Sequence, residues 1–481
     1  MKILFVVPPG SDITKYKTSS FLNFTAPPLG LAYIAAVLEE NGYSQVRILD
    51  CKALGMDFET YRRYLKQWSP NFVGIQVLTP ALYESLTTAR IAKEAGVPIV
   101  ALGGYHPTCM PDECFGTGSN NINLIFRGEA EYTTLEYLNS IENNKDWKNV
   151  QGISFRDEKD PTRIIHNPAA PFINDVEQLP LPARHLLPLD KYRLFGSSFP
   201  ATTMITSRGC PFKCDFCSVS AFYDAKWRPR SPESIANEVE VIRNELNLKA
   251  VAFVDDLFFV SNRRVREICK NLAKIDDIYW GATTRADKGD LQHLTMMRRA
   301  GCRLVFVGVE SGEQSILDNI HKRTTTAQIE QYIKNVKKAR MDSLASVSFG
   351  FPGETKESVI RTTNWVIEAL DPSLVIFTVA TPYPGTPFYH KALTEGTIKE
   401  HDYSKYNLFN PIMETSGLSR EELKELIKWA YRKFYLRPSK LIQNTKREFH
   451  YALESYGLRH FLRNGLVVIK GIVNMKALTA I

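Results

Sequence analysis

Three cysteines lie close together in the segment SRGCPFKCDFC, directly after the strand-like run TTMITSR. Cys210, Cys214 and Cys217 are spaced C-x3-C-x2-C, so one short loop can wrap a single metal centre. A structural zinc site takes four protein ligands, whereas a cluster iron that lacks a thiolate stays open to a small molecule. Three cysteines therefore indicate an incomplete, reactive iron site. A zinc loop completed by His321 or Cys302 is the alternative.

Other polar or turn-forming residues end the strand-like runs that follow this loop. They are Asp256 in FVDD, Arg285 in GATTRAD, Glu310 in GVESG, Gly353 in SFGFPGET and Tyr383 in TPYPGTP. Carboxylate and guanidinium groups can bind the charged groups of a ligand. Helix capping, ion pairing, turn formation and aromatic packing are the structural alternatives for these residues.

The strand-like runs that carry these motifs predict a barrel-like domain over residues 196–395. The runs are TTMITSR, AVAFVDD, YWGATTRA, RLVFVGVES, LASVSFGFP and LVIFTVATPYP. Six successive strand and helix units are typical of an α/β barrel, whose active site lies at the carboxyl ends of the strands. Every motif named above falls at such an end, so we expect these side chains to face one pocket.

A different α/β pattern occupies residues 1–150. Short apolar runs alternate there with helical segments, which predicts a doubly wound parallel sheet covered by helices on both faces. Ligands of such sheets bind beyond the carboxyl ends of the strands. The residues at those ends are Asp50, Thr79, Gly103, Gly104 and Gly128. The prolines of residues 151–195 predict a linker, and residues 396–481 are expected to form a helical extension.

The three-cysteine loop resembles the radical SAM signature, with Phe216 as the aromatic residue before the last cysteine. The resemblance continues through GVESGEQSILDNIHKRTT, SFGFPGET and TPYPGTPFY and covers roughly residues 1 to 390. This order of motifs is similar to that of radical SAM proteins with an N-terminal cobalamin domain. It implies a Rossmann-like cobalamin-binding domain followed by a partial (β/α)6 barrel.

The same resemblance implies that the cysteines hold a 4Fe-4S cluster whose open iron binds the amino and carboxylate groups of S-adenosylmethionine. Phe216 would belong to this site, with Asp256 against the ammonium group and Arg285 against the carboxylate of the ligand. Glu310 would face the ribose or the amino group, and Gly353 the adenine. Tyr383 would donate hydrogen if it faced the radical path, with a packed aromatic side chain as the alternative.

Cobalamin domains that use a histidine as the lower cobalt ligand carry D-x-H-x-x-G, and this chain has Asp50, Lys52 and Gly55 at those positions. A protonated lysine has no lone pair for cobalt, so we expect cobalamin to bind base-off with no histidine lower ligand. Lys52 would then meet a corrin amide or the nucleotide phosphate. The segments LGGYHPT and RGEAE, the latter with Gly128 and Glu129, resemble those around the nucleotide tail.

The resemblance implies an enzyme that removes hydrogen from an unactivated carbon and transfers a methyl group from methylcobalamin to the resulting radical, a C-methyltransferase. Cyclisation, rearrangement or oxidation with the same cofactors is one alternative. A radical SAM enzyme whose first domain serves a substrate or partner instead of cobalamin is another, because Lys52 departs from the motif. A small-molecule, lipid or isoprenoid substrate and a flavodoxin- or ferredoxin-type electron donor are expected.

Length and composition fit these expectations. With 481 residues, 44% hydrophobic and 23% charged, the chain suggests roughly two to four folded domains. The net charge of +8 is spread without Lys/Arg blocks, which disfavours nucleic-acid binding. Sparse cysteines and the absence of an apolar run of about 18 residues favour the cytoplasm. The basic, apolar tail at 458–481 predicts either peripheral membrane contact or a helix packed on the barrel.

Overall fold

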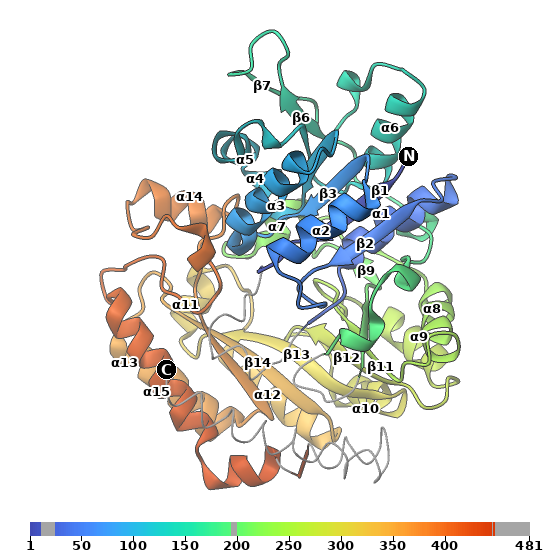
Figure 1. Ribbon diagram of the computed structural model, residues 1–481. Coiled ribbons are helices and arrows are strands. Elements are labelled where there is room, and N and C mark those ends of the chain that lie inside the picture. The colour runs from blue at the N-terminus through green and yellow to red at the C-terminus, as the bar shows by residue number, and fades with distance from the viewer. Residues whose placement is uncertain (11–24, 194–199, 445, 448–481) are drawn as a thin grey trace.

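The computed structural model describes residues 1–10, 25–193, 200–444 and 446–447. Within these ranges the main strands form a seven-stranded sheet and a six-stranded sheet, each belonging to one half of the chain (Figure 1). The blue and teal elements surround the first sheet, and the yellow and orange elements contain most of the second. The two-part α/β architecture predicted from the sequence is confirmed.

The first sheet has the strand order β2-β1-β3-β4-β5-β6-β7, and its first five strands are parallel. These strands are β1 (Ile3–Val7), β2 (Val46–Asp50), β3 (Phe72–Gln76), β4 (Ile99–Gly103) and β5 (Leu124–Phe126). The helices between them include α1 (Leu29–Glu40), α2 (Phe58–Trp68), α3 (Leu82–Glu94), α4 (Tyr105–Cys109), α5 (Pro111–Gly118) and α6 (Glu131–Glu142). Such a sheet needs a helical layer on each face.

Alternate residues of β1 show how both faces of this sheet are buried. Ile3 and Phe5 lie in one apolar core with residues of α1 and α6. Leu4 and Val6 lie in another core with residues of α2 and α3. Because successive strand residues point to opposite faces, the continuous apolar run of β1 is what a sheet covered on both sides requires. The doubly wound arrangement is confirmed.

The first sheet continues beyond Val150, into the region predicted to be a linker. The strands β6 (Ile153–Arg156) and β7 (Ile164–His166) form an antiparallel hairpin, and β6 pairs with β5. Ile153 and Phe155 are buried in the core that holds α1, which explains why these residues add to the sheet. The prolines mark the turn and the segment after the hairpin, where residues 176–191 contain only short 3-10 helices.

The second sheet is parallel throughout and has the order β15-β14-β13-β12-β11-β8. Its strands are β8 (Thr202–Met204), β11 (Ala250–Phe253), β12 (Tyr279–Thr284), β13 (Cys302–Glu310), β14 (Asp342–Phe349) and β15 (Leu374–Val379). The helices α8 (Pro232–Asn244), α9 (Asn262–Leu272), α10 (Leu291–Arg299), α11 (Gln314–Asn319), α12 (Thr326–Lys338) and α13 (Lys356–Trp365) connect them. These are the six predicted units, with β8 and β15 at the open edges.

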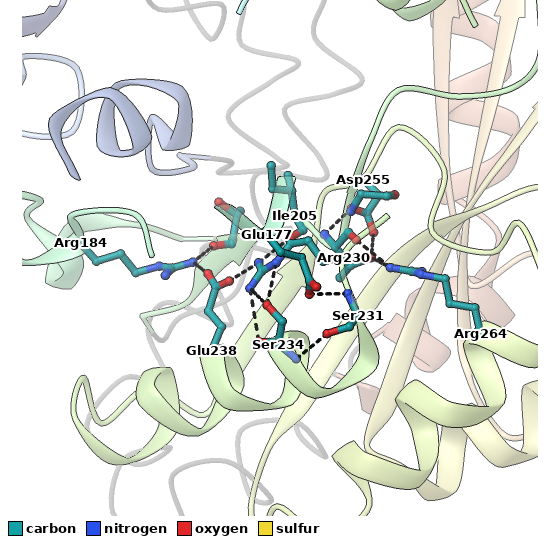
Figure 2. Close-up of polar contacts among 12 residues, drawn as sticks. Glu177, Arg184, Ile205, Arg230, Ser231, Ser234, Glu238, Asp255 and Arg264 are labelled. Carbon is teal, nitrogen blue, oxygen red and sulfur yellow. Dashed lines mark hydrogen bonds and ion pairs between the residues drawn. The ribbon is translucent and has the colours of Figure 1, made fainter. Parts of the chain in front are cut away.

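Buried ion pairs fix the edge strand β8 to the segment that precedes it (Figure 2). Arg184 donates to the Thr203 carbonyl at 2.9 Å and pairs with Glu238 of α8 at 2.5 Å. Arg230 pairs with the same carboxylate and donates to the Ile205 carbonyl at 3.0 Å. Because Glu238 is completely buried, its charge depends on both guanidinium groups. The backbone that leads to the cysteines is thereby held from two sides.

The opposite edge strand, β15, is covered by α15 (Arg420–Tyr435). The Tyr431 hydroxyl donates to the Phe377 carbonyl and accepts from the Phe377 N–H, at 3.1 and 3.2 Å. Tyr435 makes the same pair of bonds with Val375. These hydroxyls satisfy backbone groups that an edge strand would otherwise expose. The predicted tail at 458–481 lies outside the described residues, and no described helix is long and apolar enough to span a bilayer.

Candidate active site

The three cysteines lie on a loop between two short strands, β9 (Ser207–Arg208) and β10 (Arg228–Pro229), with α7 (Ser218–Tyr223) after the last cysteine. Gly209 has φ +81°, and a Cβ on it would lie 1.9 Å from the Lys226 carbonyl oxygen, so only glycine fits. The Cys217 N–H donates to the Cys214 carbonyl at 3.1 Å. Burial raises the pKa of the Cys217 thiol to about 11, so binding of metal as thiolate releases a proton.

The two residues proposed to complete a zinc site have other partners. His321 Nδ1 lies 2.9 Å from the carboxylate of Asp215. Cys302 is buried in the barrel core, and its thiol lies 3.7 Å from the Leu304 carbonyl oxygen. Among the described residues, no three His, Cys, Asp or Glu side chains are grouped for a single metal ion. A 4Fe-4S cluster differs from such a site because each cysteine thiolate binds a separate iron.

Two adjacent carboxylates at the end of β11 hold the backbone that leads into this loop. Asp255 accepts the Thr206 N–H at 2.5 Å and the Ser207 N–H at 2.8 Å. Asp256 accepts the Gly209 N–H at 2.9 Å. Burial raises the pKa of Asp256 to about 6, although the Gly209 N–H opposes the shift. The structure thus brings Asp256 to the cysteine loop, as expected, and gives it a backbone partner.

Arg285 reaches this loop directly, and Glu310 is linked to it through Lys322. The Arg285 guanidinium stacks on the Phe212 ring at 3.8 Å and lies 4.0 Å from Cys214 Sγ. Glu310 pairs with Lys322, whose Nζ lies 2.7 Å from the carboxylate. Sequence reasoning missed Lys322, which lies in the loop after α11 and carries no strand-end signal. Phe216 packs against Phe351 at 5.5 Å and lies 5.9 Å from Lys322 Nζ.

The turn after β14 contains Gly353 and a buried carboxylate. Gly353 has φ +90°, which a turn-forming glycine adopts readily. Glu354 accepts the Gly350 N–H at 2.6 Å and the Phe351 N–H at 3.0 Å, so its side chain closes the turn. Burial raises the pKa of Glu354 to about 7, against the lowering effect of these two bonds.

We expect Glu354→Gln to flatten the dependence of stability on pH. A carboxyl group with a raised pKa binds more protons in the folded state than in the unfolded state, so its contribution falls as pH rises from about 4.5 to 7. The amide keeps an acceptor for both N–H groups but has no charge to bury. Chemical unfolding at pH 5 and pH 8 should show the variant gaining on the order of 1–3 kcal/mol over wild type at the higher pH. Parallel curves would contradict this.

Tyr383, the residue predicted to donate hydrogen on the radical path or to be a packed aromatic side chain, lies in the turn after β15. Its hydroxyl donates to the Tyr406 carbonyl at 2.9 Å, and its ring packs against the core that contains Phe351 and Phe388. These contacts favour the packed aromatic alternative.

Tyr383→Phe is therefore expected to lose roughly 1 kcal/mol of unfolding free energy, because one intramolecular hydrogen bond is removed. S-adenosylmethionine cleavage should stay within about threefold of wild type, since a lost bond of this size need not move the cysteine loop. Thermal unfolding and product formation would be measured on the same sample. A fall in cleavage of two orders of magnitude with unchanged stability would restore a catalytic role.

A cavity of about 290 Å³ lies at the carboxyl ends of the first sheet, between the strands and helices α1 and α6. Gly103, Gly104, Gly128 and Glu129 line it, together with apolar side chains. A second cavity, of about 220 Å³, is lined by Asp50 and Lys52 at the neighbouring strand ends. An apolar cavity with glycine backbone at its mouth fits the nucleotide tail of cobalamin, and the lysine-lined cavity fits its polar corrin edge.

The predicted contacts of Asp50, Thr79 and Gly55 with this cofactor stay predictions, and each of these residues also has a structural role in the protein. The Asp50 carboxylate accepts the Tyr192 hydroxyl at 3.0 Å and the Ala53 N–H at 3.0 Å, so it braces the second cavity. Burial raises its pKa. Thr79 is buried with its hydroxyl 3.3 Å from His106 Nδ1, which places it in packing behind the strand ends. Gly55 turns the chain after β2 with φ +62°.

Glu129 joins the first domain to the cysteine loop. Its carboxylate pairs with Arg208 at 2.9 Å and with Arg228 at 2.7 Å, and all three side chains are buried. Arg208 also pairs with Glu131 at 2.5 Å and directly precedes Gly209. Glu129 lines the larger cavity, but its carboxylate is paired with Arg208 and Arg228. These two arginines were not identified from the sequence.

Comparison with known proteins places both halves of the chain. The model of the radical SAM superfamily matches residues 204–366, and that of the B12 binding domain matches residues 22–138. The uncharacterized methyltransferase PH0819 of Pyrococcus horikoshii is 34% identical over 469 residues, 96% of this chain and 98% of that protein. The anaerobic magnesium-protoporphyrin IX monomethyl ester cyclase of Cereibacter sphaeroides is 28% identical, over 90% of this chain and 69% of that protein.

The fold is also found in a solved structure. The radical S-adenosylmethionine methyltransferase TsrM of Kitasatospora setae, with cobalamin and a [4Fe-4S] cluster bound, aligns with a TM-score of 0.71 at 15% identity and full coverage of both chains. The resemblance expected from the three-cysteine loop and the strand-end motifs is confirmed. The cavities of the first domain and the cysteine loop fit cobalamin and a 4Fe-4S cluster that binds S-adenosylmethionine. The chain belongs to the family of cobalamin-dependent radical SAM methyltransferases.

Proposed function

We propose that this enzyme methylates an unactivated carbon of a small-molecule or lipid substrate. The proposal rests on one observation: residues of both domains line the same cavity. Arg208 and Tyr223, on either side of the cysteine loop, line it together with Gly103 and Gly128 of the first domain. The cofactor sites are therefore neighbours, as a reaction that needs a radical and a methyl group at one carbon requires.

When bound, the cluster would supply the electron that starts radical chemistry from S-adenosylmethionine, and cobalamin would carry the methyl group. The protein binds and orients them. Cys210, Cys214 and Cys217 hold the cluster, and Arg285 offers a planar donor for the carboxylate of S-adenosylmethionine. Glu310 and Asp256 offer carboxylates for its ammonium or ribose groups. Gly353 and Phe216 shape the pocket.

Residues of the first domain hold the second cofactor and exclude water. Lys52 would offer a cation to the nucleotide phosphate or a corrin amide of cobalamin, and as a protonated amine it would not serve as a ligand of the cobalt. The Tyr105 ring stacks on Phe222 of α7 at 6.3 Å, and its hydroxyl donates to the Pro384 carbonyl at 2.7 Å. One side chain thus links α4, the cysteine loop and the last barrel turn, which closes one side of the space between the domains.

A second candidate is radical cyclisation or oxidation with the same cofactors, because three relatives, including the Cereibacter sphaeroides protein, carry the name of a cyclase. A flavodoxin- or ferredoxin-type protein would supply the electron in either case. Contact of the tail at 458–481 with an anionic membrane stays a prediction, as does a lipid or isoprenoid substrate.

The test begins with protein purified without oxygen and reconstituted with iron, sulfide and hydroxocobalamin. We expect one cobalt and about four irons per chain and formation of 5′-deoxyadenosine under reduction. Methyl-labelled S-adenosylmethionine is then incubated with small-molecule and lipid extracts. Transfer of label to a carbon supports methylation, whereas a substrate that loses two hydrogens without label supports cyclisation or oxidation. Iron without cobalt would overturn the proposal.

A further inference from the structure

Lys322 is a buried cation between two groups assigned to S-adenosylmethionine. Its side chain is 9% exposed, and Nζ lies 2.7 Å from a carboxylate oxygen of Glu310. Its main-chain carbonyl accepts a hydrogen bond from the Arg285 guanidinium at 2.7 Å. The Glu310 carboxylate compensates the charge of this buried ammonium group and favours its protonated form.

The backbone around this ion pair is strained at three positions. Glu310 has φ +61°, and His321 and Arg323, on either side of Lys322, both have φ +53°. Non-glycine residues rarely adopt this left-handed conformation, and strain of this kind is retained where the surrounding structure imposes it. The pairing of β13 with β14 also shifts register between Gly308 and Glu310, and such irregularities redirect side chains beside active sites.

The strand below the ion pair leaves room for it. A Cβ on Gly308 would lie 2.4 Å from the Glu310 carboxylate and 2.6 Å from Lys322 Nζ. Any side chain at this position would therefore displace the pair. Glycine in GVESG is needed to let the two charges meet over the strand backbone.

The same segment is attached to the cysteine loop. The Asp215 N–H donates to the Ile320 carbonyl at 3.2 Å, and the Asp215 carboxylate lies 2.9 Å from His321 Nδ1. Lys322 Nζ lies 5.9 Å from the centre of the Phe216 ring. Residues 320–323 thus contact the part of the loop that lies between its second and third cysteines. A change in Lys322 is therefore expected to alter that side of the cluster site.

We propose that Lys322 is a positioning residue for S-adenosylmethionine. Its ammonium group fixes the Glu310 carboxylate and its carbonyl fixes the Arg285 guanidinium, so both are held in one orientation beside the cysteine loop. The inference rests on the proposed function, in which these two side chains bind the ligand. Without the cation, a buried Glu310 loses the charge that compensates it and no longer presents a fixed carboxylate.

The experiment compares Lys322→Met, Lys322→Gln and Lys322→Arg in the reconstituted holoenzyme. Binding of S-adenosylmethionine is measured by equilibrium dialysis with the oxidised cluster, and the electron paramagnetic resonance spectrum of the reduced cluster is recorded with and without ligand. We expect Lys322→Met to raise the Kd at least tenfold and to weaken the spectral change, and Lys322→Arg to recover most of the affinity because it keeps the charge. Lys440→Met is the matched control: this lysine is buried, paired with Asp371, and lies in the segment that follows α15.

Lys440→Met should lower the melting temperature without changing the Kd. A Kd within twofold of wild type in Lys322→Met, with the cluster intact, would overturn the inference. If Lys322→Met does not fold, Lys322→Gln decides in the same way, since it removes the charge but keeps a polar group near Glu310. Failure of the proposed function is distinguishable, because it would appear in the wild type as missing cobalt or missing transfer of the methyl label, whereas this inference is tested by the Kd of Lys322→Met relative to wild type.

Discussion

Cys214→Ala is expected to abolish S-adenosylmethionine cleavage, by about 1,000-fold or more, because a cluster held by two thiolates is not retained. Cys214 is buried, unlike the other two cysteines of the loop, and lies 4.0 Å from the Arg285 guanidinium. Its loss therefore removes the cluster ligand that lies beside the Arg285 guanidinium. Iron content, the visible spectrum and 5′-deoxyadenosine formation should all fall together. Cobalt binding should stay at one per chain, because both cavities that fit cobalamin are built around the first sheet.

Cys269→Ala is the matched control for this experiment. Cys269 is equally buried but lies in the apolar core of the barrel, where it packs with Cys302 and Leu272. The substitution should cost stability and leave iron content unchanged. Retention of about four irons in Cys214→Ala would show that another residue is the third ligand. Loss of iron in both variants would indicate that the barrel, and not the loop, had been damaged.

The strand-end residues of the barrel show what local sequence can predict. Asp256, Arg285 and Glu310 each follow a buried apolar run, and parallel topology brings their strand ends to one edge whatever the details of packing. The structure brings Asp256 and Arg285 to the cysteine loop, and it links Glu310 to the loop through Lys322. The parallel order of the strands likewise follows from alternation of strand and helix, which has only one common solution.

The local sequence does not predict which residues a polar side chain contacts in the fold. Lys322 reads as an ordinary polar residue in a loop, and only the strained backbone of its neighbours turns it toward Glu310. Thr79 ends an apolar run as Gly103 does, yet its hydroxyl lies 3.3 Å from His106 Nδ1, a contact that the local sequence does not predict. The hairpin β6–β7 was not predicted, because the prolines in the surrounding segment are typical of linkers. Such outcomes depend on contacts between residues far apart in the chain, which no local pattern encodes.

Glu129 is the residue for which a cofactor role and a structural role make different predictions. Burial raises its pKa, but Arg228 and Arg208 outweigh this effect and hold the pKa below its ordinary value. The folded state therefore binds fewer protons, and the stability that Glu129 contributes is present above the unfolded pKa of about 4.3 and lost as pH falls below it. A residue that only touched cobalamin would show no such contribution in the apo-protein.

Glu129→Ala is expected to cost about 3–5 kcal/mol of unfolding free energy at pH 7, because two buried guanidinium groups lose their shared carboxylate. Chemical denaturation of protein without cofactors measures this, and the loss should shrink as pH approaches 4. Since Arg208 directly precedes Gly209, the variant should also retain less iron after reconstitution. Its affinity for cobalamin should change less than its affinity for iron.

Glu94→Ala provides the control, since Glu94 also bridges two arginines, Arg62 and Arg90, but on the surface of α3. Water already screens those charges, so its denaturation midpoint should stay close to that of wild type. If Glu129→Ala weakened only cobalamin binding and left both the midpoint and the iron content unchanged, the expected role of Glu129 in the cofactor pocket would stand and the interdomain role would fall. If the midpoint moves in Glu129→Ala alone, the ion pairs that join the cobalamin cavity to the cysteine loop are part of what holds the two cofactor sites in register.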